Sequence, residues 1–442
     1  MLELTATFMT LLQSFSSVFT SPSFVTFRLL MTGWILSMRH RFVTDLIITS
    51  DSVDNGHFSD YHRFFSKAAW DIDMLWKGTA TELIQSFFGK DAVIVLAADD
   101  TLCRKRGLSL FGAGMHHDPL ISSRKKKLVS WGHDWVILSV VIADCAWAPT
   151  KVFAAPICAR LYKNRQGLTK GQKKKKRQSR VSEGNGQGAA AKRSQQNKNG
   201  NPGHKTRPDL LSEMLAKVAQ WFPDRRFHVV VDSLYSGESV LSRLPENMDL
   251  TGPVHPAAAL YAPAPKVQNQ RGRKRKKGAR LPSRDEWVEN KTRWQRLKFD
   301  QYGLKGTFRV KTRQGLYYKA GKDRLLKFVL SQDAVGDRPT QIFYSTNLEY
   351  SAQQILGMFS YRWATEVMHF DAKQFLGLED PANRTPKAVE RTAPMALFLY
   401  SMVLLWFHKE GRRHVTFPKR SWYKRKSEPS FRDMLTTLRR LT

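Results

Sequence analysis

The sequence predicts an α/β protein in which helices flank a mixed sheet, with a helical region first and a β-rich subdomain inserted late in the chain. Three observations lead to this class. Apolar residues recur three and four apart over the first 90 residues, short β-rich apolar runs further along end in aspartate, and strand-like runs cluster between residues 307 and 345. The 442 residues allow two to three domains of about 150 residues each.

The chain carries a large excess of positive charge. It has 72 Lys and Arg against 38 Asp and Glu, a net charge of +34. Such a field attracts polyanions, so nucleic acid is the predicted partner. The three cysteines, Cys103, Cys145 and Cys158, include no Cys-x-x-Cys pair, which excludes a disulfide framework and a Cys-rich zinc site and fits a reducing compartment.

Residues 1–90 are predicted to form an N-terminal helical region. Apolar residues follow helical spacing from Leu11 to Phe19 and again from Phe64 to Leu75, with no long strand-like alternation. Because the whole chain is strongly basic, we expect this region to bind DNA.

Residues 91–260 are predicted to hold the first part of the α/β core. Val93 to Ala98 is a short apolar run typical of a strand buried on both faces, and Trp135 to Ile142 is a second strand signal. The glycine-punctuated stretch between them favours an antiparallel meander. The elements that follow alternate between helix and strand: a helix from Asp209 to Trp221, a strand from Phe227 to Asp232 and a short helix around Ser236 to Leu244.

Two segments are rich in basic residues. The first, residues 163–207, has Glu183 as its only carboxylate and cannot bury enough apolar surface to fold, so we expect a disordered insertion. Basic runs usually form solvated tails, but on a chain of this charge we expect both segments to contact DNA phosphates without sequence preference. The predicted contact residues are Lys173, Lys174, Lys175, Lys176 and Arg177 in the first segment, and Arg273, Lys274 and Arg275 in the second.

Residues 261–350 combine this second basic segment with the inserted β subdomain. Its strands are predicted to form a separate small sheet, from Thr307 to Lys319, Leu325 to Ser331 and Gln341 to Ser345.

Residues 351–442 are predicted to be helical. Ser351 to Leu376 has the pattern of one helix of the core, and a C-terminal helical region follows it. The apolar run from Ala393 to Phe407 has 15 residues, fewer than the 18 or more typical of a membrane helix, so we predict a buried helix and no membrane partner.

Three carboxylates are candidates for a functional site, two because they follow apolar strands and one because it lies between two basic residues on a helix. Asp99 and Asp232 each follow an apolar strand, and a buried carboxylate is costly unless it is paired or binds a cation. Glu366 lies on the late helix between Arg362 and Lys373. Three acids from distant chain positions suit a pair of Mg²⁺ ions, because hard cations take oxygen ligands. With DNA as the partner, this pattern predicts phosphoryl transfer.

Each of these residues also has a simpler interpretation. An aspartate at a strand end, such as Asp232, is often a turn residue or a helix N-cap, and Arg362 with Glu366 can be a plain i,i+4 ion pair. Asp99 is followed by Asp100, and only one of two successive strand residues can face a site. The Asp-x-Thr spacing favours Asp99. The runs His116-His117-Asp118 and His133-Asp134 lack a further ligand at the spacing that would complete a zinc site, so we predict no functional role for them.

The acids and their neighbours resemble the DDE transposases of bacterial insertion sequences. The matching residues are Asp99-x-Thr101 and Val229-Val230-Val231-Asp232-Ser233, each at an apolar strand, and Arg362-x-x-x-Glu366 followed by Lys373. The resemblance covers roughly residues 91–406. It implies a ribonuclease-H-like catalytic core with a β-rich insertion between the second Asp and the Glu. It also implies nicking at transposon ends and strand transfer into target DNA.

Residue by residue, the resemblance implies that Asp99, Asp232 and Glu366 hold two Mg²⁺ ions, for which Mn²⁺ can substitute. Arg362 and Lys373 would contact the backbone of the transposon end. The implied partners are double-stranded DNA, both as transposon ends and as target, and a second copy of the chain in a homodimer. The implied location is the bacterial cytoplasm, in association with the nucleoid. The chain departs from the signature at Phe359, where the family has a Tyr three residues before the Arg; Tyr361 is displaced by two.

Two other functions fit the same sequence. One is a catalytically inactive, DNA-binding transposase remnant whose acids have become structural. An assay for DNA nicking that depends on divalent ions would distinguish such a remnant from an active transposase. The other is a structure-selective nuclease on the same fold. Competition between transposon-end sequences and branched DNA junctions would distinguish this nuclease from a transposase.

Overall fold

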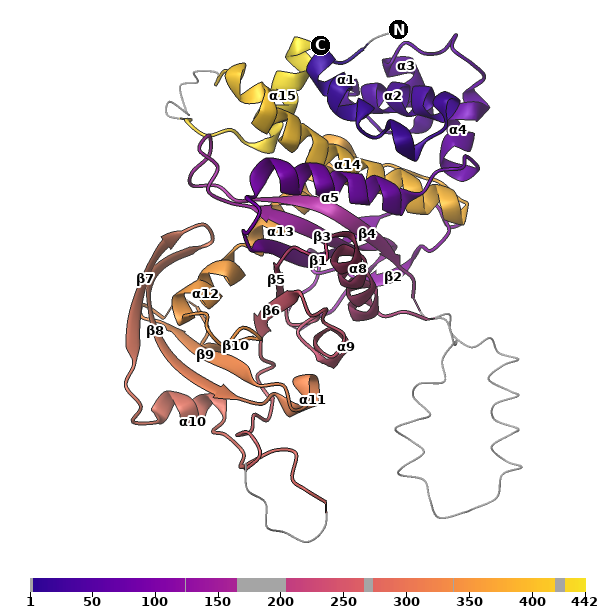
Figure 1. The fold of residues 1–442 in the computed structure, drawn as a ribbon. Coiled ribbons are helices and arrows are strands. Elements are labelled where there is room, and N and C mark those ends of the chain that lie inside the picture. Colours follow the sequence, from indigo (N-terminus) through magenta and orange to yellow (C-terminus); the bar gives the residue numbers. More distant parts are fainter. Residues whose placement is uncertain (1–2, 124, 165–203, 266–272, 337, 418–425) are drawn as a thin grey trace, which may run out of the picture.

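The computed structural model describes residues 3–123, 125–164, 204–265, 273–336, 338–417 and 426–442 (Figure 1). Its helices are α1 (Ala6–Gln13), α2 (Ser21–Leu36), α3 (Val43–Thr49), α4 (Phe58–Ser66), α5 (Ile72–Phe87), α8 (Arg207–Trp221), α9 (Glu238–Leu241), α10 (Arg284–Glu289), α11 (Tyr318–Gly321), α12 (Ala352–Ser360), α13 (Trp363–Leu376), α14 (Pro386–Lys409) and α15 (Phe431–Leu441). Its strands are β1 (Ile94–Arg104), β2 (Gly114–His117), β3 (Val129–Ile142), β4 (Phe153–Tyr162), β5 (Phe227–Val231), β6 (Met248–Pro253), β7 (Gln295–Gln301), β8 (Leu304–Gly315), β9 (Leu326–Asp333) and β10 (Gln341–Ser345).

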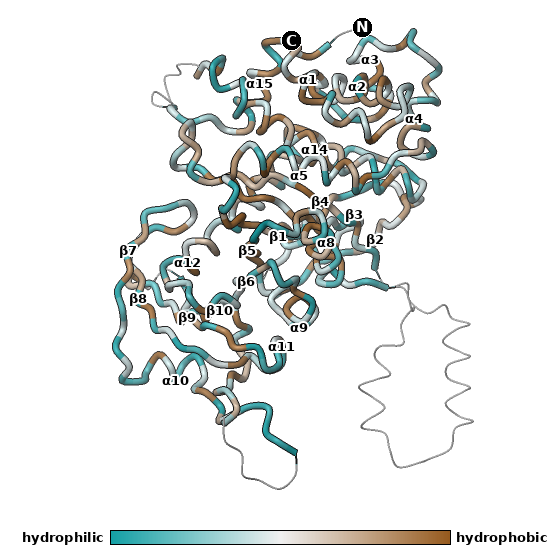
Figure 2. The backbone as a smooth tube through the Cα atoms, in the orientation of Figure 1, coloured by the Kyte–Doolittle hydropathy of each residue, from teal (hydrophilic) through white to brown (hydrophobic). Residues whose placement is uncertain are grey.

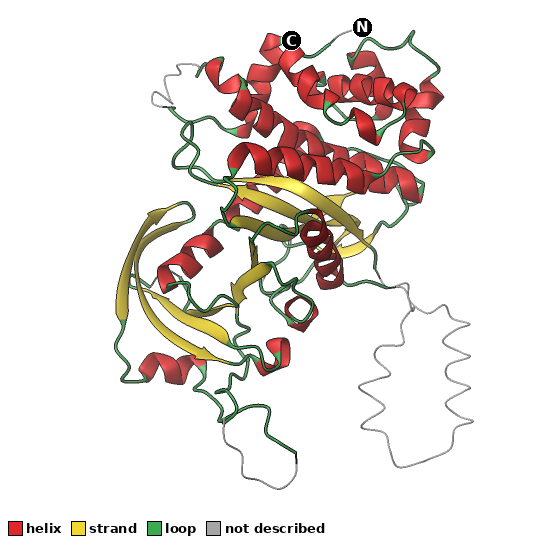
Figure 3. Ribbon diagram, viewed as in Figure 1, coloured by secondary structure: helices red, strands yellow, loops and turns green. Residues whose placement is uncertain are grey.

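Helices from both ends of the chain form a helical layer on one side of the sheet: α5 and α14 lie against the strands, and α1, α4 and α15 pack on α14 from beyond (Figures 1 and 3). Residues 393–407 of α14 are buried, and the Phe398 ring lies 5.1 Å from that of Phe15 in an edge-to-face contact. Figure 2 shows the apolar residues gathered along α14 and the strands beneath it. The prediction of a buried helix is confirmed. Among the described residues, α14 alone has the length and apolar composition of a membrane span, and protein encloses it.

The described strands form one ten-stranded mixed sheet. Its order is β2-β3-β1-β5-β6-β10-β9-β8-β7, and β4 also pairs with β3. β1 is antiparallel to β3 and parallel to β5, which is parallel to β6. In β1, Ile94 and the run from Leu96 to Ala98 have no exposed surface, as the apolar run predicts. A mixed sheet flanked by helices is the predicted α/β class.

The prediction of a separate small sheet for the insertion is wrong. β10 pairs antiparallel with β6, with Phe343 opposite Pro253 and Ser345 opposite Thr251, so β7 to β9 continue the central sheet through β10. Without β10, β6 would be an edge strand with unpaired backbone groups, and the pairing satisfies them. Strand patterns in the sequence do not show which edge receives which strand.

The insertion nevertheless has a core of its own. Its apolar residues pack between β7 to β10 and α12: Leu297, Phe299, Leu304, Phe308, Val310, Val329, Phe343, Ala352, Ile355 and Leu356. Leu297 and Phe299 alternate with polar residues in β7, a period-two signal that sequence reasoning missed. The strand predicted from Thr307 to Lys319 stops at Gly315, and the short helix α11 begins at Tyr318.

The single helix predicted from Ser351 to Leu376 is two helices. The N–H groups of Tyr361 and Arg362 bond carbonyls three residues back, which tightens the chain into a turn between α12 and α13. α12 packs on the insertion, whereas α13 packs on β1 and β4. The two helices contribute to different cores, α12 to that of the insertion and α13 to the main core. The sequence gives no sign of this break, because no proline or glycine marks it.

Lys173 to Arg177 lie outside the described residues, which resume at His204. The predicted insertion boundary at Arg207 needs correction, because Arg207 is the first residue of α8. The Thr206 side chain caps this helix in a capping box with Asp209.

Tyr344 ties the insertion to the loop after Asp232, and its removal should be measurable. Its buried hydroxyl donates to the Ser236 carbonyl at 2.9 Å. We expect Tyr344→Phe to lower the free energy of unfolding by about 1–3 kcal/mol, since a buried carbonyl loses its donor. Urea denaturation checks this, with Tyr318→Phe at a partly exposed ring as the control. Equal effects of the two changes would contradict the linkage.

Candidate active site

Asp99 lies near the middle of β1 and points toward α13. Its Oδ2 accepts hydrogen bonds from Arg362 Nη1 at 2.7 Å and from the Thr365 hydroxyl at 3.2 Å. Its side chain is 14% exposed. The carboxylate therefore lies at the junction of the sheet and the helix that carries Glu366.

Glu366 is joined to Asp99 through one guanidinium. Arg362 Nη2 lies 2.8 Å from Glu366 Oε1, while Nη1 holds Asp99. The simpler i,i+4 ion pair is present, but it is one half of a bridge between two acids from distant parts of the chain. Arg362 stands at the first turn of α13, next to the break after α12.

Asp232 follows β5, and the register of the sheet places it beside Asp99. β5 runs parallel to β1 with Val231 opposite Ala98, so the next residue of each strand is an aspartate. Asp232 also has the simpler role of a turn residue, because its Oδ1 accepts from the Leu234 N–H at 2.9 Å and the Tyr235 N–H at 3.4 Å. Its second carboxylate oxygen takes no part in this turn.

Electrostatics couple the three acids. Burial, together with the charges of Asp232 and Glu366, raises the pKa of Asp99 to about 6, although Arg362 acts to lower it. Arg362 pairs with Asp99 and Glu366, and Asp232 adds a third negative charge nearby. The site has an excess of negative charge that favours additional cations.

Asp100 faces away from this site, into a buried network behind it. Its Oδ1 accepts from the Tyr235 hydroxyl at 2.8 Å, and its Oδ2 lies 3.4 Å from Arg207 Nε. Arg207 also bonds Asp134, which is nearly inaccessible, with an Nε to Oδ2 distance of 2.6 Å. Burial and the charge of Asp134 raise the pKa of Asp100 to about 7. The network joins β1, β3, α8 and the loop that carries Asp232.

Sequence reasoning missed Arg207, Tyr235 and Asp134. No local pattern identifies them, because their partners come from distant parts of the chain. His116 lies in the same region, with Nδ1 3.5 Å from Asp134 Oδ2, and His133 Nε2 pairs with the Phe111 carbonyl at 2.9 Å. Neither histidine forms part of a metal site among the described residues.

Lys373 anchors α13 to β1. Its ammonium donates to the Leu102 carbonyl at 2.6 Å and lies 3.3 Å from Glu379 Oε1. Phe359, at the position of the signature tyrosine, packs its ring 4.7 Å from that of Phe343 in the core of the insertion. The structure therefore gives both residues partners within the chain.

The second basic segment lies away from these acids. Arg273, Lys274 and Arg275 are exposed, next to the stretch that the structure leaves undescribed at the far end of the insertion (Figure 1). Lys277 in the same segment lies over the Tyr261 ring, 3.6 Å from its centroid.

A hollow of about 500 Å³ adjoins the site. Asp232 and Arg362 line it on one side, and the rest of its wall comes largely from proline and aliphatic residues near β6 and β10, including Pro253, Val254, Pro256, Pro339 and Ile342. This hollow offers a reacting group access to Asp232.

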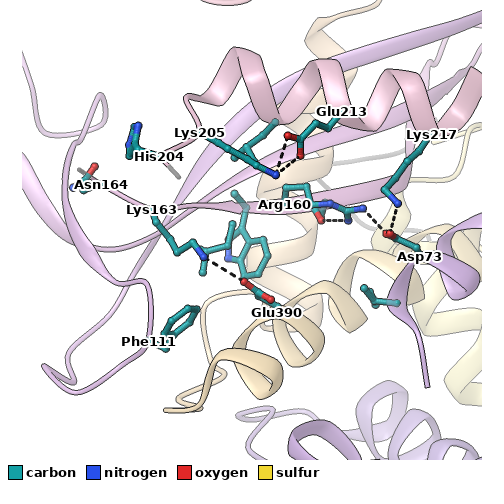
Figure 4. A pocket seen from close by; sticks show the side chains of 15 residues that line it. Asp73, Phe111, Arg160, Lys163, Asn164, His204, Lys205, Glu213, Lys217 and Glu390 are labelled. Carbon is teal, nitrogen blue, oxygen red and sulfur yellow. Dashed lines mark hydrogen bonds and ion pairs between the residues drawn. The ribbon is translucent and has the colours of Figure 1, made fainter. Parts of the chain in front are cut away.

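A larger hollow, of about 640 Å³, lies near β4 and α8, and its charged side chains are held in ion pairs (Figure 4). Asp73 pairs with both Arg160 and Lys217, and Lys205 pairs with Glu213 at 2.8 Å. It therefore lacks the charge excess of the acidic site.

The donor set of the acidic site suits a hard cation. Asp99, Asp232 and Glu366 offer only carboxylate oxygens, and two of them already share a cationic group. As placed, no three acids, histidines or cysteines of the described chain are close enough to hold a metal ion. Arg362 occupies the position between Asp99 and Glu366.

The fold and site together define an α/β protein with two acids side by side on adjacent parallel strands, Asp99 within β1 and Asp232 just after β5. Residues 15–316 match the family described as DDE superfamily endonuclease, and the chain belongs to that family. The predicted relationship to DDE transposases and the ribonuclease-H-like α/β class are thereby confirmed. The matched residues include Asp99 and Asp232, whereas Glu366 lies beyond them. No curated protein matches the chain.

The buried network behind Asp99 should be costly to break. We expect Arg207→Met to lower the free energy of unfolding by about 3 kcal/mol or more, because Asp134 would be left buried without its cation. Arg243→Met is a matched control, since Arg243 pairs with Asp209 at a more exposed position and should cost at most about 1 kcal/mol. Chemical denaturation of both variants checks this, and an Arg207 variant as stable as the control would contradict it.

Proposed function

We propose that this protein is a transposase of insertion-sequence type that cuts and joins DNA strands at Asp99, Asp232 and Glu366. The observation that carries the proposal is the bridge of Asp99 and Glu366 by Arg362, beside an aspartate at the adjacent parallel strand end. Membership of an endonuclease family supports the reaction class.

The three carboxylates would hold two Mg²⁺ ions, or Mn²⁺ in their place. When bound, such ions activate the attacking hydroxyl and stabilise the leaving oxygen of an in-line displacement. The chain itself holds these carboxylates on β1, just after β5 and on α13, and keeps Asp99 shielded from bulk water. Its acids position groups rather than act as covalent nucleophiles.

Arg362 has two roles in this proposal. In the chain alone, its guanidinium neutralises Asp99 and Glu366 and so holds α13 against β1. During the reaction it is the cation nearest the acids, and a planar guanidinium is well suited to a phosphate. We propose that Arg362 exchanges its carboxylate contacts for the DNA backbone.

The proposed partners are transposon ends and target DNA, and a second copy of the chain that would hold the other end. The predicted contacts at Lys173 to Arg177 and at Arg273 to Arg275 remain part of this proposal. They would supply affinity independent of sequence, because each phosphate neutralised releases counterions.

Glu366→Gln tests the chemistry. The substitution preserves volume and removes the charge, so we expect Mg²⁺-dependent nicking of end-containing DNA to fall by more than about 100-fold, the upper range for loss of an outer partner of a metal site. Duplex binding should change little. Glu349→Gln, at an exposed position outside the site, makes the same chemical change and should nick normally. Near-normal nicking by Glu366→Gln would remove this residue from the active site, and nicking by neither variant nor the parent chain would indicate a remnant.

Lys373→Ala tests the predicted backbone contact against an anchoring role. If Lys373 reaches DNA, the slope of log K against log salt for end binding should fall by about one unit. Lys409→Ala, which removes an exposed ion pair with Glu82 on the helical layer, is the control. A lower unfolding free energy with an unchanged salt slope would assign Lys373 to anchoring α13 alone.

A further inference from the structure

The outer face of β7 and β8 carries a row of basic side chains, which we call the basic strand face: Arg296, Lys298 and Arg309. In β7 and β8, Leu297, Phe299, Phe308 and Val310 point into the core with α12. The side chains between them therefore point to the opposite face. Arg296 and Lys298 are exposed there, and Arg309 is half-buried.

Two arginines of this face stand directly opposite each other. Arg296 is the cross-strand partner of Arg309, and like charges in that relation destabilise a sheet. In the described part of the chain, no carboxylate pairs with Arg296, Lys298 or Arg309, and the acid further along β7, Asp300, pairs with Lys305. The chain therefore keeps an unfavourable pair where a neutral or acidic residue would stabilise the fold.

The positive groups are also held in place. Arg309 donates to Gln332 Oε1 at 2.8 Å and lies over the Trp294 ring, 5.5 Å from its centroid. Beneath it, Lys311 is buried and donates to three carbonyls at the end of α10, including that of Asn290 at 2.7 Å. This cap fixes the chain that leads into Trp294 and β7. Ordering the arginine in advance lowers the entropy cost of binding an anion.

At the hollow near β4 and α8, by comparison, Arg160 and Lys217 are held in ion pairs with Asp73. The three bases of the basic strand face have no such carboxylate partner among the described residues. An unmatched basic row beside an aromatic ring is typical of a surface that contacts nucleic acid. The row lies on the edge strands β7 and β8, several strands away from β1 in the sheet (Figure 3). The turn between β7 and β8, at Gly303 and Leu304, lines a hollow that Arg362 also lines.

We propose that the basic strand face is a second contact surface for duplex DNA, which it binds through the phosphate backbone without reading the sequence. The choice of DNA as the polyanion rests on the proposed function. The surface itself rests on the unmatched arginine pair. RNA and acidic protein surfaces are the competing partners that the experiment must separate.

The first test uses Arg296→Glu in the full chain. The new carboxylate would face Arg309, so the opposed pair becomes an attractive one and the melting temperature should stay equal or rise. Affinity for a random-sequence 30-base-pair duplex should nevertheless fall several-fold at low salt. A stability gain together with a binding loss cannot come from misfolding. Unchanged duplex affinity would overturn the proposal.

The second test counts phosphates. Arg296→Gln with Lys298→Gln should reduce the slope of log K against log salt by nearly two units, at about 0.9 for each contact. The matched control is Lys77→Gln with Arg412→Gln, two exposed basic residues on the helical layer, which changes net charge equally. Equal loss in both double variants would reduce the effect to net charge and overturn the proposal.

A competition binding experiment identifies the partner, and it measures binding without requiring DNA cleavage. Unlabelled duplex DNA should displace the labelled duplex more effectively than structured RNA or poly-glutamate at equal charge. Preference for either competitor would overturn the choice of DNA. A parent chain that binds through this face but never nicks would refute the proposed function alone, and normal nicking with no effect of the substitutions would refute this surface alone.

Discussion

The parallel pairing of β1 with β5 is the constraint on which the site depends. With Val231 opposite Ala98, both strands reach an aspartate at the same level, and backbone hydrogen bonds rather than side chains set their separation. A shift of one residue in either strand would turn Asp99 or Asp232 to the other face of the sheet. Asp99 and Asp232 are therefore placed by neighbouring inner strands of the sheet, and α13 adds Glu366 from one side.

Because Asp99 and Asp232 are fixed side by side in a partly shielded site, the protein must supply cations that neutralise acids in this part of the sheet. Two arginines do so, in different ways. Arg362 neutralises Asp99 from α13 on the side where the hollow opens, and Arg207 neutralises Asp100 and Asp134 on the other face. The second network includes the inaccessible side chains of Asp134 and Tyr235 and suits a permanent structural role. The first borders the hollow, so its guanidinium can exchange partners, which suits a site where charged substrates enter.

Features that depend on the local sequence could be predicted from it, and features that depend on distant contacts could not. β1, β5 and the buried helix α14 could be predicted because each is a continuous apolar run with its own length and composition. Asp99 could be preferred over Asp100 from spacing, and the structure gives the two residues opposite faces. The β6 to β10 junction, the break before Arg362 and the partners of Arg207 could not be predicted. They depend on contacts between distant segments that no local pattern encodes.

The β6 to β10 junction also determines how the two ends of the sheet act together. Because β10 continues the central sheet into β9, β8 and β7, the outer strands are held by an unbroken hydrogen-bond ladder to the strands that carry the acids. A separate subdomain on a linker would allow the outer face to turn freely. A continuous sheet instead fixes the direction of Arg296 and Arg309 relative to Asp99. A duplex held at the far strands would therefore approach the acidic site in a limited range of orientations.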